Sequence, residues 1–158
     1  MRKDPKRLEQ LRSLMVLDTA PEVMYDDITR TLATSFDVPI AMVNLLDAER
    51  DWFKSCIGLP FGESSADTSF CEVFFGLTDD VVIVEDTLEH RRFSVHPFVT
   101  GAPHVRFYAS ARLMVRGQTL GTLCVYDTKP KKVTPEQEDQ LRSLGRAAME
   151  MLRKRQPE

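Results

Sequence analysis

Hydrophobic and polar positions alternate most regularly between residues 105 and 127. In the first half of this stretch, apolar residues occupy every second position: Val105, Phe107, Ala109, Ala111, Leu113 and Val115. A period of two is typical of a β-strand with one apolar face. Gly117 gives the backbone freedom for a tight reversal, and β-branched and aromatic residues recur in the second half. The pattern predicts an antiparallel hairpin, which needs further strands and a covering layer of helix.

Helical spacing marks the N-terminal part of the chain. Within residues 1–17, one face carries Leu8, Leu11 and Met15 between charged neighbours, which predicts a short amphipathic helix. A second helix is expected to follow, with Asp18 or Thr19 as its cap and Pro21 in its first turn. The apolar stripe of this second helix consists of Tyr25, Ile28, Leu32 and Phe36.

The segment 134–155 shows the clearest helical pattern. Thr134 can cap this helix, and the acidic residues of its first turn favour the positive end of the helix dipole. Its apolar stripe consists of Leu141, Leu144, Ala148, Met151 and Leu152.

Short apolar runs between the helices predict strands at 40–46, 52–57 and 81–84. Residues 64–74 are expected to form a short helix, whereas no period holds across 87–103. Irregular segments of this length inside a compact domain are often functional. Strands that group in an antiparallel sheet, with helices at the chain ends, predict an α+β domain.

Composition limits the possible partners. The chain has 158 residues, enough for a single domain whose core needs no disulfide or metal. A net charge of −3 argues against a nucleic acid or an acidic membrane as the main partner. The longest near-apolar run, 38–46, is too short to cross a bilayer, and no signal-peptide pattern is expected at the start. Three widely spaced cysteines indicate no disulfide framework, which favours a cytoplasmic location.

Patterns typical of catalysis or metal binding are weak. The three cysteines are expected to be small buried fillers, as free cysteines often are: Cys56, Cys71 and Cys124. The three histidines lie in the irregular segment, without the helical spacing of a ligand pair, so no metal is expected: His90, His96 and His104. The glycine-rich patterns that hold phosphate, GxGxxG and GxxxxGK, are absent.

Ten short pieces of the chain together resemble the GAF domain family, a small sensory fold related to PAS. One is Asp-Thr-Ser-Phe-Cys at 67–71, and the others lie at 17–22, 26–29, 38–41, 52–55, 85–86, 92–93, 99–101, 106–109 and 120–127. The subgroup occurs beside diguanylate cyclases and histidine kinases, or alone, in bacteria. Two positions depart from it: Arg112 stands where proline is frequent, and Glu85 where a neutral residue is common.

The resemblance implies a GAF/PAS-like, about six-stranded antiparallel sheet. N- and C-terminal helices are expected on one face, and an irregular segment with a short helix on the other. It implies a single domain over 1–158 with a non-catalytic sensory or regulatory role in signal transduction, in which a small molecule binds in a cup on the sheet.

The candidate ligand-binding residues come from the middle of the chain and the first hairpin arm: Asp67, Phe70, Cys71, Asp86, Arg92, Phe93, Arg106 and Tyr108. The structural alternative is that Asp86 and Arg92 cap backbone groups while Arg106 pairs with an acid such as Asp67. The resemblance specifies no cofactor. Covalent attachment of a bilin would need a cysteine near His90 or His96, and none lies there. The Asn-Lys-Xaa-Phe-Asp-Glu motif of cyclic-nucleotide-binding GAF domains is also absent.

Two other functions stay open. One is a ligand-free dimerisation module, because the terminal helices of GAF domains, here 1–17 and 134–155, often pack in a homodimer. The other is thiol-dependent reduction of free methionine sulfoxide, which one GAF branch performs with a cysteine relay that is not recognised here. No output domain is expected after Glu158, so any signal is expected to pass to a separate output protein.

Overall fold

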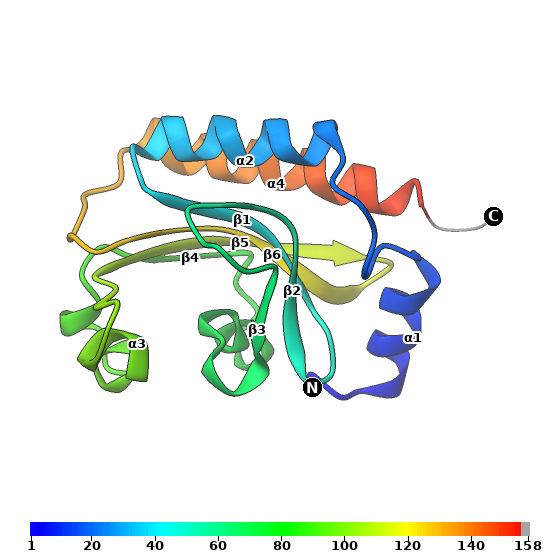
Figure 1. The fold of residues 1–158 in the computed structure, drawn as a ribbon, viewed down its shortest axis with the longest axis horizontal. Helices are drawn as coiled ribbons and strands as arrows, with labels where there is room; N and C mark the ends of the chain where they lie inside the picture. Colours follow the sequence, from blue (N-terminus) through cyan, green and yellow to red (C-terminus); the bar gives the residue numbers. More distant parts are fainter. Residues whose placement is uncertain (156–158) are drawn as a thin grey trace.

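Six strands form one antiparallel sheet in the order β3–β2–β1–β6–β5–β4 (Figure 1). The structure is a computed structural model and describes residues 1–155. It confirms the predicted α+β class and the sheet of six strands. Their bounds are β1 (Ile40–Leu46), β2 (Arg50–Ile57), β3 (Glu63–Ser65), β4 (Val81–Val84), β5 (Phe107–Val115) and β6 (Gln118–Asp127).

The predicted hairpin is β5–β6, in which residues 107–115 pair with residues 118–127. Arg116 and Gly117 form the turn, with φ values of 52° and 80°. Two positive φ angles are typical of the two-residue turns whose twist matches that of the flanking strands. The other edge of β6 pairs with β1, so the hairpin joins the two halves of the sheet.

Two long helices, α2 (Val23–Phe36) and α4 (Pro135–Arg153), lie side by side over one face of the sheet (Figure 1). The predicted stripe of α2 is buried against this face: Tyr25, Ile28, Leu32 and Phe36. It shares one apolar core with the predicted apolar face of β5, on which α4 packs: Phe107, Ala109, Ala111, Leu113 and Val115. Burying each large apolar side chain contributes about 1.5–3 kcal/mol, so this layer supplies much of the stability of the fold.

The start and the stripe of α4 agree with the sequence pattern. Thr134 Oγ1 accepts a hydrogen bond from the Gln137 backbone N–H, and the Gln137 side chain accepts one from Thr134. Three members of the predicted stripe are buried and two are partly exposed: Leu141, Ala148 and Leu152, then Leu144 and Met151. Most of the stripe is therefore used to cover the sheet.

The predicted cap of α2 is wrong. The helix follows Glu22 as its N-cap residue, and no side chain caps it. Asp18 instead forms an ion pair with Arg50, 2.8 Å away, and Thr19 donates a hydrogen bond to the carbonyl of Val16. Both short polar side chains are thus held by the loop that precedes the helix.

α1 (Pro5–Ser13) lies at one end of the sheet, beside β6 and apart from the layer of α2 and α4 (Figure 1). Leu8 and Leu11 are buried as predicted, but Met15 is 78% exposed. The helix ends at Ser13 and Met15 has a φ of 51°, which turns its side chain away from the core. Leu14 takes the buried position instead.

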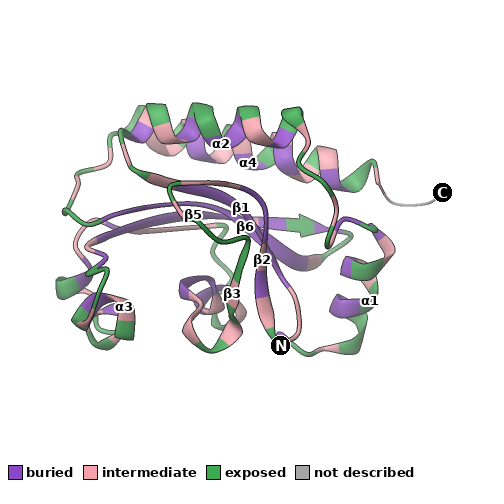
Figure 2. Ribbon diagram, in the orientation of Figure 1, coloured by how far each residue is buried: buried purple, intermediate pink, exposed green. Residues whose placement is uncertain are grey.

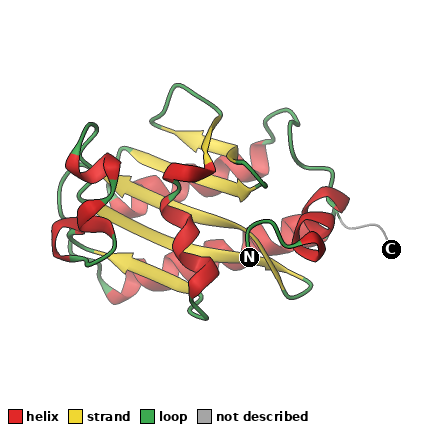
Figure 3. Cartoon of the chain, turned by 90° about the horizontal axis from the view of Figure 1, so that it is seen from below, coloured by secondary structure: helices red, strands yellow, loops and turns green. Residues whose placement is uncertain are grey.

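Short helical turns cover the opposite face of the sheet (Figure 3). They are the 3-10 helices η1 (Ala66–Thr68), η2 (Phe70–Gly76), η3 (Thr87–Glu89) and η4 (Phe93–Val95), together with α3 (Pro97–Thr100). The expectation of one helix over 64–74 is therefore wrong, since β3, η1 and η2 share that range. Purple colouring along the central strands in Figure 2 reflects their burial between the two covering layers.

The second face of β5 is more deeply buried than its polar residues would predict. Tyr108 and Ser110 are buried under the short helices. Arg112 stacks over Phe74, 5.0 Å from the ring centre, and donates hydrogen bonds to the carbonyls of Leu77 and Asp79. Arg112 therefore anchors the connection between η2 and β4.

Glu85, which like Arg112 departs from the family pattern, holds the connection between β6 and α4. Its Oε2 accepts a hydrogen bond of 2.7 Å from the Val133 backbone N–H, and its carbonyl accepts one from Lys131.

Within residues 1–155, every helix is too short or too polar to cross a membrane.

Close approach of β1 and β6 requires a glycine at position 121. A Cβ atom built there would overlap the carbonyl oxygen of Asn44. We expect Gly121→Ala to lower the free energy of unfolding by about 1–3 kcal/mol, because the strands must separate to admit the methyl group. Urea unfolding measures this, with Gly62→Ala as the control, since a Cβ atom there meets nothing within 4 Å. Equal stability of the two variants would contradict the packing of β1 on β6.

Candidate functional site

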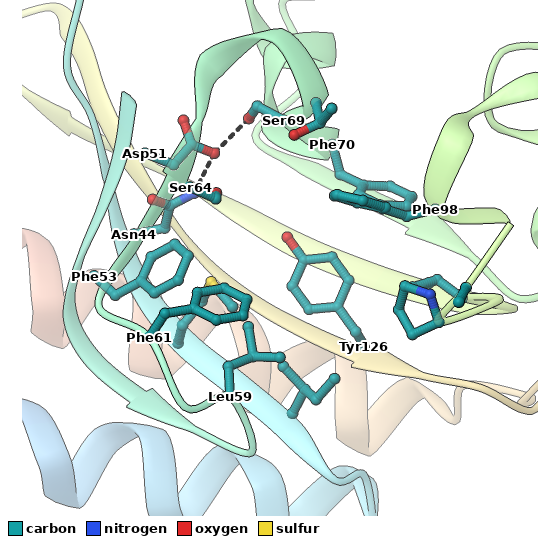
Figure 4. A pocket seen from close by; sticks show the side chains of 16 residues that line it. Asn44, Asp51, Phe53, Leu59, Phe61, Ser64, Ser69, Phe70, Phe98 and Tyr126 are labelled. Atoms are coloured by element: carbon teal, nitrogen blue, oxygen red, sulfur yellow. Dashed lines mark hydrogen bonds between the residues drawn. The ribbon is translucent and has the colours of Figure 1, made fainter. Parts of the chain in front are cut away.

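A cavity of about 500 Å³ lies between the sheet and the short helices (Figure 4). Five aromatic side chains form much of its wall: Phe53, Phe61, Phe70, Phe98 and Tyr126. Its polar lining residues are Asn44, Asp51, Ser64, Thr68 and Ser69. A mostly apolar cavity of this size with a few placed polar groups is typical of a small-molecule site.

The alternation of the strands brings these side chains to one face. Met42 and Asn44 are two residues apart on β1, and Asp51 and Phe53 are two apart on β2. Residues two apart point to the same side of a sheet. The cavity floor is therefore fixed by the same period of two that predicts the strands, and η1, η2 and α3 close over it.

Polar groups gather at one end of the cavity (Figure 4). Asp51 Oδ2 accepts hydrogen bonds from Asn44 Nδ2 at 3.0 Å and from Ser69 Oγ at 2.5 Å. Asp51 is 3% exposed and Asn44 is 1% exposed. A buried carboxylate needs such partners, because burial removes the water that would otherwise solvate its charge.

Arg2, from the segment before α1, supplies the positive charge next to Asp51. Its Nη1 lies 3.0 Å from Asp51 Oδ1, and its Nε donates to Glu72 Oε1 at 2.8 Å. Arg7 fixes the position of Arg2 by donating hydrogen bonds to the Arg2 carbonyl. The N-terminal segment is thereby tied to the polar end of the cavity.

Burial raises the pKa of Asp51, and the charge of Arg2 opposes that rise. Folded Asp51 therefore binds its proton more tightly than the unfolded chain does, so protonation stabilises the fold at low pH. This stabilisation is lost as the pH rises through the folded-state pKa.

An aromatic cluster lies behind the cavity wall. The ring of Phe70 lies 5.1 Å from that of Phe93 and 5.4 Å from those of Tyr108 and Tyr126. Cys71 Sγ lies within this cluster, 3.2 Å from the hydroxyl of Tyr108. Burial raises the pKa of both tyrosines well above the ordinary value.

The eight predicted residues separate into two groups in the structure. Phe70 lines the cavity, and the remaining three buried members lie in the cluster behind it: Cys71, Phe93 and Tyr108. The four charged members do not line the cavity: Asp67, Asp86, Arg92 and Arg106. The structure thus brings together the apolar half of the predicted set.

Each charged candidate has a different position. Asp86 Oδ1 accepts a hydrogen bond from the Leu88 backbone N–H and so caps η3. Arg106 donates to the carbonyl of Val99 rather than pairing with Asp67. Asp67 and Arg92 are exposed.

Sequence reasoning missed Asn44, Asp51 and Arg2. Asn44 gave a signal, because it is the one polar residue in an otherwise apolar strand, β1. Asp51 is two residues from Phe53, but a charged residue at a strand start is ordinarily exposed. Arg2 gave no signal, since it meets Asp51 across 49 residues of chain.

Two of the three histidines, His90 and His96, hold the local structure of residues 87–104. His96 Nδ1 accepts a hydrogen bond from Phe98 N at the start of α3, and its ring stacks 4.1 Å from that of Phe70. His90 Nδ1 accepts from the backbone N–H groups of Arg92 and Phe93. Residues 1–155 contain no group of three histidine, cysteine or acidic side chains that could hold a metal ion.

The raised pKa of Asp51 predicts a pH-dependent difference between wild type and Asp51→Asn. As the pH rises from about 4 to about 7, we expect the stability of wild type to fall relative to the variant. Urea unfolding at several pH values measures this. Asp18→Asn is the control with the opposite sign, because the hydrogen bond from Arg50 lowers the pKa of Asp18. If the stability of wild type instead rises with pH relative to that of Asp51→Asn, burial does not dominate the pKa of Asp51.

A family model of the GAF domain matches residues 20–152. A cyclic di-GMP phosphodiesterase of Pseudomonas aeruginosa is 35% identical over 119 residues, which make up 75% of this chain. The match covers 20% of that relative, so the chain spans only a small part of the enzyme's length.

Solved structures share the fold. The GAF domain of a phosphoenolpyruvate-protein phosphotransferase from Acinetobacter has a TM-score of 0.67 at 19% identity, and covers 94% of this chain and 93% of its own. A type II free methionine-R-sulfoxide reductase from Thermoplasma acidophilum has a TM-score of 0.63 at 14% identity, with coverage of 92% and 94%. The blue-light absorbing form of the PixJ GAF domain of Thermosynechococcus elongatus has a TM-score of 0.64 at 12% identity, with coverage of 93% and 89%. The family model, supported by these likenesses in fold, shows that the chain belongs to the GAF domain family.

Proposed function

We propose that this GAF domain is a non-catalytic sensory or regulatory domain that binds a small molecule in the cavity over the sheet. The observation that carries the proposal is the cavity itself: about 500 Å³, walled by aromatic rings and carrying a buried polar group at one end. Ligand sites of proteins have this size and composition.

The surroundings of the thiols support a role without catalysis. Cys71 and Cys124 are completely buried, so neither thiol is open to a substrate in solvent. Burial raises the pKa of Cys124, whereas for Cys71 burial is outweighed by the hydrogen bonds to Cys124, Thr122 and Tyr108, which lower the pKa. Reactive cysteines are instead partly exposed and electropositive in their surroundings. The rival proposal, reduction of free methionine sulfoxide, predicts NADPH consumption when the protein is incubated with that substrate and a thioredoxin system.

A sensory domain needs an output, which we propose is a separate signalling protein or another part of a longer chain. The phosphodiesterase of Pseudomonas aeruginosa, which is much longer than this domain, is consistent with such an arrangement. The three free cysteines support a reducing, cytoplasmic setting.

Binding of an aromatic probe tests the main proposal. We expect indole to bind the wild-type protein, because its flat ring can stack against the aromatic wall. Leu59→Trp should weaken this binding by about tenfold or more, since Leu59 lines the cavity and a larger side chain occupies its volume. Ligand-detected NMR measures the affinity.

Leu77→Trp is the matched control, because Leu77 is 40% exposed and does not line the cavity. This variant should bind indole as the wild type does. The proposal fails if indole does not bind, or if both tryptophan variants bind it equally well.

Self-association is a second proposed function, favoured by apolar exposure near the chain ends. Met15, Val23 and Met24 are 78%, 74% and 48% exposed. Met15 and the start of α2 lie near the end of α4, because Arg155 donates hydrogen bonds to the Met15 carbonyl and to the side chain of Glu22, the residue before Val23. Exposed apolar side chains that gather at terminal helices suit a homodimer interface.

Sedimentation velocity tests the homodimer. We expect the wild-type protein to sediment as a dimer and the double variant Met15→Glu/Met24→Glu as a monomer, because a buried glutamate opposes association. Leu88→Glu changes an equally apolar and exposed residue in η3 and should remain dimeric. A wild-type monomer at high concentration would rule out this second function.

A further inference from the structure

The polar end of the cavity is closed by contacts within the protein. Asp51 Oδ2 receives hydrogen bonds from Asn44 and Ser69, and Asp51 Oδ1 faces Arg2 Nη1 at 3.0 Å. Asn44 Oδ1 has no donor among residues 1–155, but it is covered as well. Both side chains are almost completely buried, so a molecule in the cavity does not reach their polar atoms. The Asp51 carboxylate therefore contributes no accessible charge to the wall.

Asp51 is also the one charged residue among the 16 described residues that line the cavity. The aliphatic hydroxyls of the wall belong to Ser64, Thr68 and Ser69. Ser69 donates its hydrogen to Asp51, and Thr68 donates to the carbonyl of Ser65, so two of these three hydroxyls already have an acceptor. The wall thus offers a ligand neither an accessible cation nor an accessible anion.

The charged cluster behind the polar end is balanced within itself. Arg2 donates a hydrogen bond to Glu72 and lies beside Asp51. Arg7 in turn donates to the carbonyl of Arg2. Two positive and two negative side chains therefore lie together, and their charges offset one another at short range. This cluster leaves no unpaired charge that could serve as a partner for a ligand in the cavity.

Aromatic and aliphatic side chains make up most of the surface that a ligand would touch. Phe53, Phe61 and Tyr126 are grouped around the space below the polar end, and Phe70 and Phe98 lie across from them (Figure 4). Aromatic walls favour flat rings, which they contact face to face or edge to face. Because burial of apolar surface is favourable and non-directional, this wall contributes affinity in proportion to the apolar area of the ligand.

A charged group would lose its hydration against this wall. Moving an ionised carboxylate or ammonium into apolar surroundings is very unfavourable unless an opposite charge or hydrogen bonds replace the lost water. Among the described lining residues, no accessible charged side chain supplies that replacement. We infer that the cavity binds an uncharged, largely apolar ring compound and excludes rings that carry a carboxylate, phosphate or ammonium group. This inference rests on the proposed function, because it assigns the chemical class of the ligand of the same cavity.

Two pairs of benzene derivatives test the inference, because the members of each pair have nearly the same size but differ in charge at pH 7. Benzamide is neutral and benzoate is negative, while benzyl alcohol is neutral and benzylamine is positive. We expect the wild-type protein to bind each neutral member about tenfold or more tightly than its charged counterpart, since only the charged member loses strong hydration. Dissociation constants from NMR chemical-shift titration measure both ratios.

A charge placed in the wall should change one of these ratios in a known direction. Leu59 lines the cavity and is partly exposed, so the ammonium group of Leu59→Lys can stay hydrated at the solvent side of the wall. In this variant the ratio of benzamide to benzoate affinity should fall to about one or below, because benzoate gains a charged partner. Leu77→Lys is the matched control, since Leu77 is exposed and does not line the cavity. It should keep the wild-type ratio.

The outcomes distinguish failure of this inference from failure of the proposed function. If benzoate or benzylamine binds as tightly as its neutral counterpart, the uncharged class is overturned, while the cavity still stands as a ligand site. Tighter binding of benzylamine would indicate an aromatic cage for a cation instead. An equal fall of the ratio in both lysine variants would place the selection outside the cavity and overturn the inference as well.

Two further results concern the neutral probes. If indole binds and neither benzamide nor benzyl alcohol does, the inference fails alone, because both probes are uncharged and smaller than indole. If indole and all four probes fail to bind, the proposed function fails with it. The wild-type ratios need no variant, so they decide the inference even if Leu59→Lys does not fold.

Discussion

Burial of both faces of the central sheet is the constraint on which the rest of this structure depends. β1, β6 and β5 carry large apolar side chains on each side, so neither face can meet water. Two long helices cover one face, and their regular stripes fill the space against it. The other face is covered by short 3-10 helices and one turn of α-helix. Such pieces seldom exceed one or two turns and expose irregular surfaces, so they close over the sheet and leave a cavity beneath.

A buried carboxylate beside this cavity creates the second requirement. The cost of removing Asp51 from water is offset by Asn44, Ser69 and the guanidinium of Arg2. Arg2 in turn bridges to Glu72 and is held by Arg7 of α1. The electrostatic state of the cavity and the position of the N-terminal segment are therefore linked through one ion pair, so a change at either end acts on the other.

The elements that depend on local pattern were predictable from the sequence. The alternation along β5, the stripe of α2 and the Thr134 cap of α4 each rest on residues within one element, and all three match the structure. Where the chain is short or irregular, packing decides: Met15 points outward because α1 stops at Ser13.

The site was predictable only in part, for a related reason. Phe70 and its aromatic neighbours follow from the preference of large rings for the interior. Chemical type alone does not place the charged candidates: Asp86 caps η3, and Arg106 donates a hydrogen bond to a backbone carbonyl. The polar end depends on contacts between residues far apart in the chain, such as Arg2 with Asp51, which no local pattern encodes.

We propose that the cavity on the second face holds a small molecule. Native mass spectrometry of freshly purified protein tests it most directly, because a small molecule held against the aromatic wall adds its mass to that of the folded chain. We expect a folded species heavier than the polypeptide by one small molecule per chain, with the extra mass lost on denaturation. A folded species with the mass of the polypeptide alone, unchanged after incubation with a cellular small-molecule extract, would contradict it.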